Sequence, residues 1–129
     1  MQDEPTPPEV LGAVAAFLRT VVAVETKGAT SFQARVAANA LEMMRRQLEL
    51  TPAADADERD RLTALLRREG SLFELNTELA RRLEAGEVDL STPGLRAHLW
   101  RTTMAKLAVD QPTYAAYQAE LAAAKSLEE

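Results

Sequence analysis

The sequence has no cysteine, and His98 is the only histidine among its 129 residues. Without cysteine the chain cannot form disulfides, thiol nucleophiles, iron–sulfur clusters or cysteine-rich zinc sites. A single histidine cannot supply a multi-histidine metal centre either. The sequence therefore predicts no metal site and no cofactor. We expect His98 itself to be exposed, because it lies opposite the apolar stripe of its helix.

Long apolar runs and clustered glycines are also missing. The five glycines are isolated, so no glycine-rich loop is available to cradle a phosphate. The longest apolar stretch, residues 10–24, is interrupted by Arg19 and is shorter than the ~20 residues of a membrane-spanning helix. The first residues are acidic, unlike the basic start of a signal peptide. The net charge of −5 disfavours binding to nucleic acid or anionic membranes. We expect a soluble cytoplasmic protein that binds neither.

Helix-forming residues are abundant. The chain contains 24 alanines and 18 leucines but no isoleucine, and alanine and leucine favour helices over strands. A length of 129 residues suits one domain. We predict an all-α fold, a compact bundle of five to six helices with up-and-down connections. The single domain spans residues 1–129, with an ordered core at about 7–121 and a frayed tail at 122–129.

Capping residues, prolines and glycines place the helix boundaries. Thr6 and Ser71 each precede a glutamate by three residues, which is the pattern of a capping box. Pro52 predicts a break between the second and third helices, and Gly70 and Gly86 predict the ends of the third and fourth. The predicted helices cover about residues 7–26, 30–50, 55–69, 72–85 and 91–109, with a last helix starting at 112.

The first predicted helix is apolar on nearly all sides. It carries Val10, Val14, Phe17 and Val21 on turns that also hold further valines and leucines. A helix of this kind is typical of the centre of a bundle. We therefore expect residues 7–26 to form the most buried helix.

The second predicted helix carries polar residues at and beside its apolar stripe. Asn39 lies on the line of Phe32, Val36 and Met43 at 100° per residue. An unpaired buried amide costs ~1–3 kcal/mol, so we expect Asn39 to be mostly buried and hydrogen-bonded, with Arg35 partly shielded. The alternative is a groove for an anionic ligand or partner peptide, because arginine binds carboxylates and phosphates bidentately. Its candidate residues are Arg35, Asn39, Glu42 and Arg46. Elsewhere, Asn76 is expected to make a structural hydrogen bond.

Three segments carry a family resemblance. FQARVAANAL (residues 32–41), LNTEL (75–79) and KLAVDQP (106–112), the last followed by Tyr114, resemble a family of small all-helical bacterial domains of unknown function. The resemblance extends from about Pro8 to Tyr117. It implies an accessory role beside aminoglycoside-phosphotransferase-like kinases and acyl-CoA dehydrogenases, but it implies no activity. Arg35 and Asn39 match the distinctive polar positions of that pattern.

Two functional classes follow from these observations. The first is a non-catalytic accessory or interaction domain that binds a protein partner or a second copy of itself. The second is a domain that binds a small anionic ligand, or an enzyme, using the candidate groove. Within the second class, catalysis is less favoured than ligand binding, because the chain offers no nucleophile with an adjacent base. Glu42 is also a poor general base, since the arginines beside it favour its ionised form.

Overall fold

The computed structural model describes residues 3–126, and within that range it contains helices and turns but no strand. The prediction of an all-α fold is confirmed. The chain divides into two compact units, Met1–Thr51 and Pro52–Glu129. One helix runs through the boundary between them. The prediction of one domain stays a prediction, which a single cooperative unfolding transition would support.

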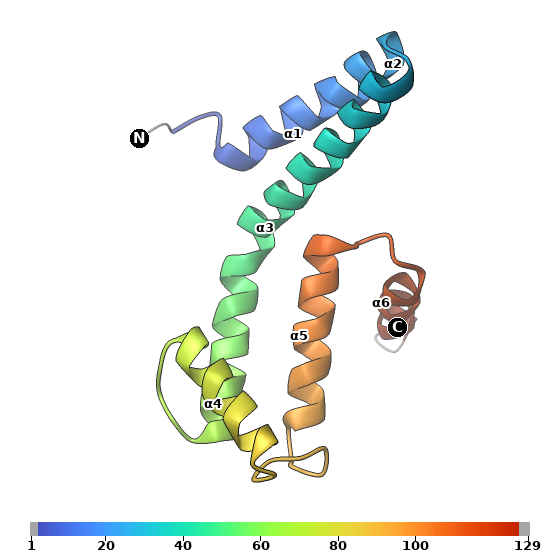
Figure 1. The fold of residues 1–129 in the computed structure, drawn as a ribbon. Helices are drawn as coiled ribbons and strands as arrows, with labels where there is room; N and C mark the ends of the chain where they lie inside the picture. Colours follow the sequence, from blue (N-terminus) through green and yellow to red (C-terminus); the bar gives the residue numbers. More distant parts are fainter. Residues whose placement is uncertain (1–2, 127–129) are drawn as a thin grey trace. The chain divides into compact units, whose positions relative to one another are not determined.

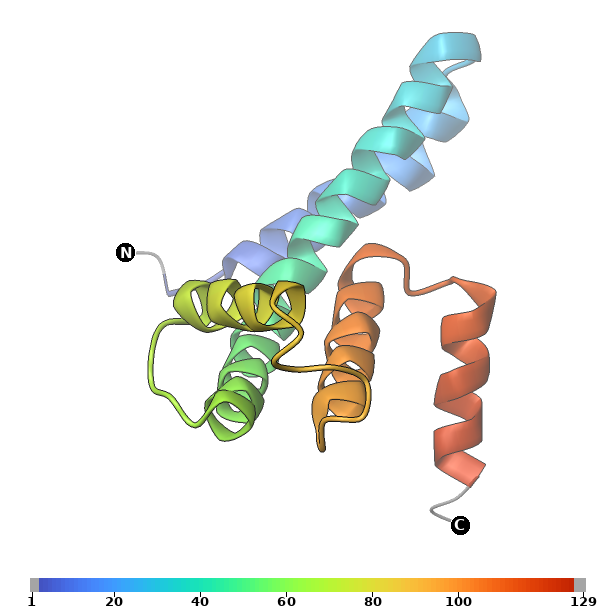
Figure 2. The same cartoon turned by 60° about the horizontal axis from the view of Figure 1, so that its bottom comes forward.

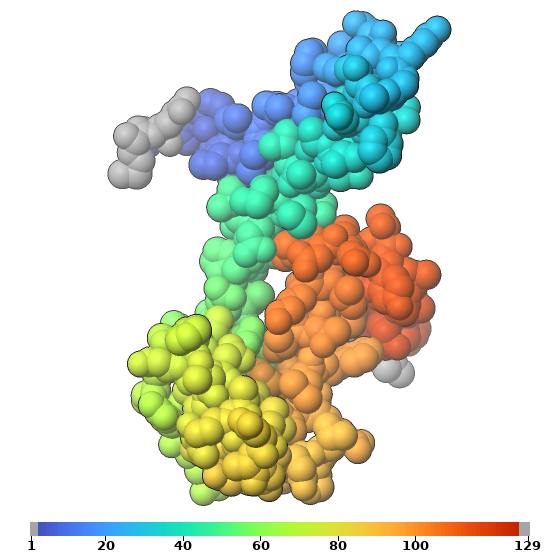
Figure 3. All heavy atoms as spheres, viewed as in Figure 1, coloured from blue at the N-terminus to red at the C-terminus, as the bar shows by residue number. Residues whose placement is uncertain are grey.

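The first unit is a helical hairpin (Figure 1). Its first arm is a continuous run of α1 (Pro7–Phe17), one turn of π-helix η1 (Leu18–Val22) and α2 (Ala23–Glu25). Its second arm is the N-terminal part of α3 (Gly28–Leu66). The predicted capping box begins the first arm, where the backbone N–H of Thr6 donates to Oε2 of Glu9 at 2.7 Å. The arms are in contact along their length (Figure 3).

Small residues fill the space between the two arms. Ala15 and Ala23 of the first arm and Ala34 and Ala38 of the second are buried. Ser31 is buried with them, and its hydroxyl donates to the Ala23 carbonyl at 2.7 Å. Short side chains at a helix contact let the two backbones approach closely. The hairpin interior is therefore narrow and contains little apolar area.

Several large apolar side chains of the first arm are exposed, whereas Leu11, Leu18 and Val22 are half-buried. Val10, Val14 and Phe17 are exposed, and Phe17 is 55% exposed. The expectation that this is the most buried helix was wrong, because only Ala15 and Ala23 are buried in it. Its single neighbour in the hairpin covers one stripe of the helix surface. That stripe contains Ala15 together with the half-buried Leu11, Leu18 and Val22.

The second correction concerns Pro52. The predicted helices at 30–50 and 55–69 are one helix, α3, and Pro52 lies inside it. Proline removes one i→i−4 hydrogen bond, here the bond that would go to the Leu48 carbonyl. The residues that follow are rich in alanine, the best helix former. The helix therefore continues, although the boundary between the two compact units lies at the same position.

The end of α3 also differs from the prediction. The helix ends at Leu66 and not at residues 68 or 69, and Gly70 is not its terminating residue. Arg67 takes the left-handed conformation instead, with a φ of 51°. This conformation crowds the Cβ atom of an L-residue against the following carbonyl. The structure thus places an arginine where glycine is the usual residue.

Replacing Arg67 with glycine should therefore stabilise the protein. Arg67→Gly relieves the Cβ strain but gives the unfolded chain more freedom, so we expect a gain of about 0.5–1 kcal/mol in the free energy of unfolding. Urea denaturation followed by circular dichroism measures it. The control Arg59→Gly, inside α3, should lose about 1 kcal/mol. A loss at Arg67 as well would contradict the left-handed end of α3.

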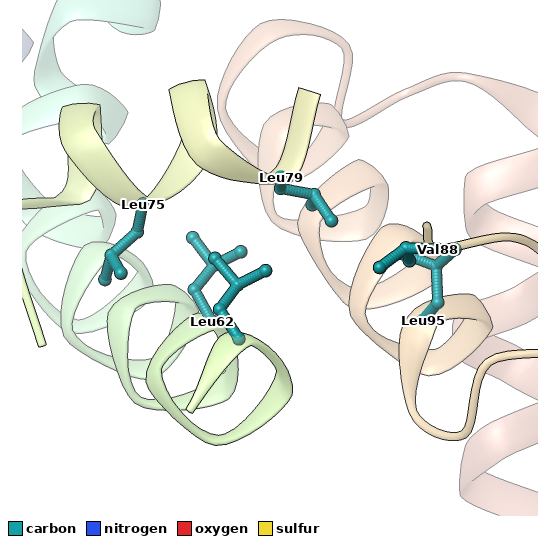
Figure 4. Close-up of a cluster of buried hydrophobic side chains, with 6 residues drawn as sticks. Leu62, Leu75, Leu79, Val88 and Leu95 are labelled. Atoms are coloured by element: carbon teal, nitrogen blue, oxygen red, sulfur yellow. The ribbon is translucent and has the colours of Figure 1, made fainter. Parts of the chain in front are cut away.

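The second unit packs three segments around one apolar cluster (Figures 2 and 4). They are the C-terminal part of α3, α4 (Leu72–Glu84) and the start of α5 (Leu95–Asp110), which is reached through a loop. The predicted capping box at Ser71 is present, since its backbone N–H donates to Oε2 of Glu74 at 2.8 Å. Gly86 follows α4 with a positive φ of 71°, as a terminating glycine does. The cluster consists of Leu62, Leu66, Leu75, Leu79, Val88 and Leu95.

The last two helices begin later than predicted. α5 begins at Leu95 after Gly94, whose φ is 87°, because the preceding residues form a turn in which Oδ1 of Asp89 accepts from the Ser91 hydroxyl. α6 covers Ala115–Ser126 and lies beside α5 in both ribbon views (Figures 1 and 2). Residues 122–126 of the predicted frayed tail are helical. Residues 127–129 of that tail lie outside the described residues.

Candidate functional site

The residues of the predicted groove lie on the hairpin. Asn39 is exposed, and so is Arg35, which corrects the expectation of burial and shielding. The contact face of α3 is the stripe of Ser31, Ala34 and Ala38, and Asn39 falls beside it. The amide of Asn39 is nevertheless bonded within the fold, since its Oδ1 accepts from Nη2 of Arg19 at 2.9 Å. Arg19 belongs to the π-helical turn η1 of the opposite arm.

Glu42 is paired with a residue that the prediction did not include. Its Oε2 lies 2.9 Å from Nη2 of Arg45, and Arg45 also reaches Glu49 at 3.1 Å. The hydrogen bond that Arg45 donates to Glu42, with the charges of both glutamates, raises the pKa of Arg45. Arg45 lies over Gly12 of α1, where a Cβ atom would stand 3.4 Å from its Cδ. Arg46 is half-buried. Binding of a ligand by this face stays a prediction.

Asn76 joins two helices of the second unit. Its Nδ2 donates to Oε1 of Glu58 on α3 at 2.9 Å and to the Leu72 carbonyl at 3.1 Å. The side chain is exposed. Both of its partners belong to the protein, so its observed contacts are structural.

His98 is buried and not exposed, with only 3% of its surface accessible. The buried or half-buried positions of α5 include Leu95, His98, Thr102 and Val109, with a spacing of three, four and seven residues. The stripe taken as apolar in the sequence faces outward, since Leu99 and Trp100 are exposed. The stripe that contains His98 and the stripe that contains Leu99 and Trp100 are close in polarity. Helical periodicity alone therefore predicted the wrong one as buried. The three- and four-residue spacing from Leu95 to Thr102 was the available signal.

An ionic cluster lies next to His98. Asp57 pairs with two arginines, Arg61 of its own helix and Arg101 of α5, and its Oδ1 accepts from Nη2 of Arg101 at 2.9 Å. Nη2 of Arg61 also donates to the Thr102 hydroxyl at 3.1 Å. Burial and the charge of Arg101 lower the pKa of Arg61. Spacing along the sequence does not bring these four residues together, because they come from helices 40 residues apart.

Arg61, His98 and Arg101 line a cavity of about 310 Å³ in the second unit. Nδ1 of His98 and Nε of Arg61 are buried without a hydrogen-bond partner. Burial lowers the pKa of His98, and the charge of Arg61 lowers it further, while the charge of Glu58 opposes the shift. These effects favour the neutral imidazole of His98. The remaining walls are Ala64, Leu65, Pro93, Gly94 and Ala97.

Two other features of the described residues bear on function. No group of three or more histidine, aspartate or glutamate residues between positions 3 and 126 could hold a metal ion. In the same range, Pro7–Glu25 is one helical segment long and apolar enough to cross a membrane, by length and composition only. Core helices and signal sequences pass the same test, and only 11% of this apolar segment is buried. The expectation of no membrane binding stays a prediction.

These features define a small all-helical domain with an alanine-lined hairpin and a second helical unit that contains a cationic cavity. The chain belongs to the family described as Domain of unknown function (DUF6285), whose model matches residues 24–114. The match covers all of α3, α4 and α5, and it leaves α1 and α6 outside. Comparisons with curated proteins and with solved structures gave no match.

Proposed function

We propose that the chain is a non-catalytic accessory domain that binds protein through its N-terminal hairpin. One observation carries the proposal: the hairpin buries alanines between its arms and exposes large apolar side chains on the outside. Ten large apolar side chains are exposed among residues 3–51, so the hairpin presents apolar surface to water. They are Val10, Val14, Phe17, Val24, Phe32, Val36, Met43, Met44, Leu48 and Leu50.

These exposed side chains follow helical stripes. Val10, Val14 and Phe17 repeat at four and three residues on α1, so they lie one above another on one face. Phe32, Val36 and Met43 are spaced by four and seven residues and likewise share one face of α3. Single exposed apolar residues are ordinary on protein surfaces, but continuous apolar patches mark interaction sites. A helix buries its apolar stripe against another layer of structure. The hairpin supplies no such layer for these stripes.

The occupant that we propose is a second copy of the hairpin. Residues 1–51 contain six acidic and five basic residues, so two hairpins can approach with almost no net repulsion. Two-fold pairing of identical hairpins makes a four-helix bundle, and two-fold dimers are the commonest oligomers. A dimer interface of standard size buries ~800 Å² per partner. The exposed stripes of α1 and α3 supply the apolar side chains for such an interface.

The family resemblance suggests other partners. It implies an aminoglycoside-phosphotransferase-like kinase or an acyl-CoA dehydrogenase, which would place the domain in the cytoplasm. The same apolar stripes would then pack on a helical surface of that enzyme. The hairpin's low net charge and repeated stripes favour the second copy. Binding of the enzymes is the alternative outcome of the test below.

The test is the mass of the full chain in solution, measured by light scattering after size-exclusion chromatography at micromolar concentration. We expect twice the mass of one chain for the wild type and the mass of one chain for Phe17→Glu, because the glutamate places a charge in the apolar interface. The matched control is Phe73→Glu on α4, since Phe73 is 81% exposed and lies in the other unit. It should leave the dimer intact.

Three outcomes decide the proposal. A dimer broken by Phe17→Glu and kept by Phe73→Glu supports it. A second outcome is a monomer that binds a purified kinase or dehydrogenase of the implied classes and loses this binding on Phe17→Glu. This outcome overturns self-association but supports a protein-binding role for the hairpin. A monomer that binds neither enzyme, or a dimer unaffected by Phe17→Glu, overturns docking through the hairpin. Circular dichroism of each variant checks that it is folded.

A further inference from the structure

The cavity at the start of α5 has buried polar atoms in its wall that lack hydrogen-bond partners. It is independent of the hairpin. It measures about 310 Å³ and lies within the second unit. His98 lines it while being 97% buried, and its Nδ1 has no hydrogen-bond partner. Nε of Arg61, also in the wall, is buried and unpartnered as well. Buried polar atoms in folded proteins are almost always bonded, so these two atoms indicate a missing acceptor.

The charges around the cavity are unbalanced. Arg61 and Arg101 line it, and no carboxylate does. Asp57, which pairs with both arginines, and Glu58, whose charge reaches His98 and which accepts from Asn76, are outside the lining. The N-terminus of α5 adds positive charge, because Gly94 begins that helix without a side-chain cap and also lines the cavity. A helix N-terminus carries about half a positive charge and attracts anions. The missing acceptor is therefore negatively charged.

We propose that this cavity binds a small organic monocarboxylate through Arg61, Arg101 and His98. The two guanidinium groups of the lining share only the carboxylate of Asp57, so they have N–H groups left for one further carboxylate. The oxygens of a carboxylate accept from guanidinium and imidazole N–H groups in charge-assisted hydrogen bonds. His98 serves as a donor in the tautomer that carries its proton on Nδ1. This assignment goes beyond the proposed docking function and stands if that function fails.

The walls of the cavity select the rest of the ligand. Leu65, Pro93 and Ala97 offer carbon surface rather than further hydrogen-bond groups. The volume lies at the lower end of the range for ligand pockets, ~300–1,000 Å³. A short aliphatic or aromatic group attached to the carboxylate fits this lining. A doubly charged phosphate without an apolar group fits it less well.

The test compares acetate and hexanoate as probes in solutions of the full chain. His98 is the only histidine of the chain, so its imidazole signals in a nuclear magnetic resonance spectrum report on this cavity alone. We expect a saturable shift of these signals with both acids. Hexanoate should bind at least about tenfold more tightly than acetate, because its extra methylene groups leave water for an apolar wall. Bound hexanoate should also raise the pKa of His98, since a carboxylate favours the imidazolium.

Two pairs of variants separate a built site from general charge effects. Arg101→Gln should weaken hexanoate binding by about tenfold, since one charge-assisted hydrogen bond is lost. Arg96→Gln removes the same charge from the same helix at an exposed position outside the cavity and should leave the affinity within about twofold. Ala97→Phe should abolish binding by filling the cavity. Arg96→Phe, which adds the same ring outside the cavity, should not.

The proposal is overturned if hexanoate gives no saturable shift of the His98 signals. It is also overturned if Arg96→Gln and Arg101→Gln weaken binding equally, because binding then follows the net charge of α5. Equal affinities for acetate and hexanoate would overturn the assignment of an apolar ligand group. The Arg101→Gln protein must keep the wild-type circular dichroism spectrum. If it does not, Ala97→Phe and Arg96→Phe decide the question by themselves.

Discussion

Replacing Leu62 with alanine is expected to lower the free energy of unfolding by about 3 kcal/mol, within the range of 2–5 kcal/mol for such core substitutions. Leu62 is fully buried in α3. It lies in the cluster to which α4 and α5 contribute Leu75 and Leu95 (Figure 4). The substitution removes apolar contacts with these elements and leaves a cavity that close packing cannot refill. Urea denaturation of the full chain measures the loss.

Leu90→Ala is the matched control for this substitution. Leu90 belongs to the same unit but is 60% exposed, so its truncation should change stability by less than about 0.5 kcal/mol. Equal losses at Leu62 and Leu90 would contradict the position of the core. A small loss at both would indicate that the second unit is loosely packed.

The local features of the chain were predictable from sequence because each depends on a few neighbouring residues. Thr6 with Glu9, and Ser71 with Glu74, form the predicted capping boxes, and Gly86 terminates α4 with a positive φ. A capping box needs only the correct residue types three positions apart. The all-α class follows in the same way from helix propensity summed along the chain.

The burial of the helices was not predictable in this way. The first helix has apolar residues on nearly every side, which is compatible both with a central helix and with one whose apolar side chains lie in an interface. Alanine and glycine mark the hairpin contact, because Ala15 and Ala38 are fully buried and Gly12 gives space to Arg45. Hydrophobicity scales give such small residues little weight. The large valines and Phe17 therefore dominated the prediction.

The candidate sites show the same limit. The groove residues lie on one stretch of α3, where their shared face can be read from spacing. The cavity residues come from two distant segments, with Arg61 on α3 and His98 and Arg101 on α5, and Asp57 of α3 pairs with both arginines. Which of the twelve arginines meets which carboxylate depends on tertiary packing. His98 was misplaced because the stripe that α5 buries contains Thr102 and His98 among apolar residues.

Pro52 offers the second large effect, in the opposite direction. Pro52→Ala is expected to raise the free energy of unfolding by about 1–3 kcal/mol, because proline in a helix interior costs ~3 kcal/mol relative to alanine. The new N–H can donate to the Leu48 carbonyl. The gain in the free energy of unfolding is smaller than the full cost of a helical proline, because the native helix has already adjusted to the proline ring. Thermal and urea denaturation measure the change.

Pro8→Ala is the control, because Pro8 lies in the first turn of α1, where proline removes no helical hydrogen bond. Its stability change should stay within about 0.5 kcal/mol. The comparison separates two descriptions of residues 51–52. If the chain ended one helix at Thr51 and began another near Asp55, as the sequence alone indicates, Pro52 would stabilise a turn and its replacement would lower stability. Since α3 continues through Pro52, alanine should stabilise the helix. It should also make the unfolding of Met1–Thr51 and Pro52–Glu129 more cooperative, because the helix that joins them then has an uninterrupted hydrogen-bond ladder.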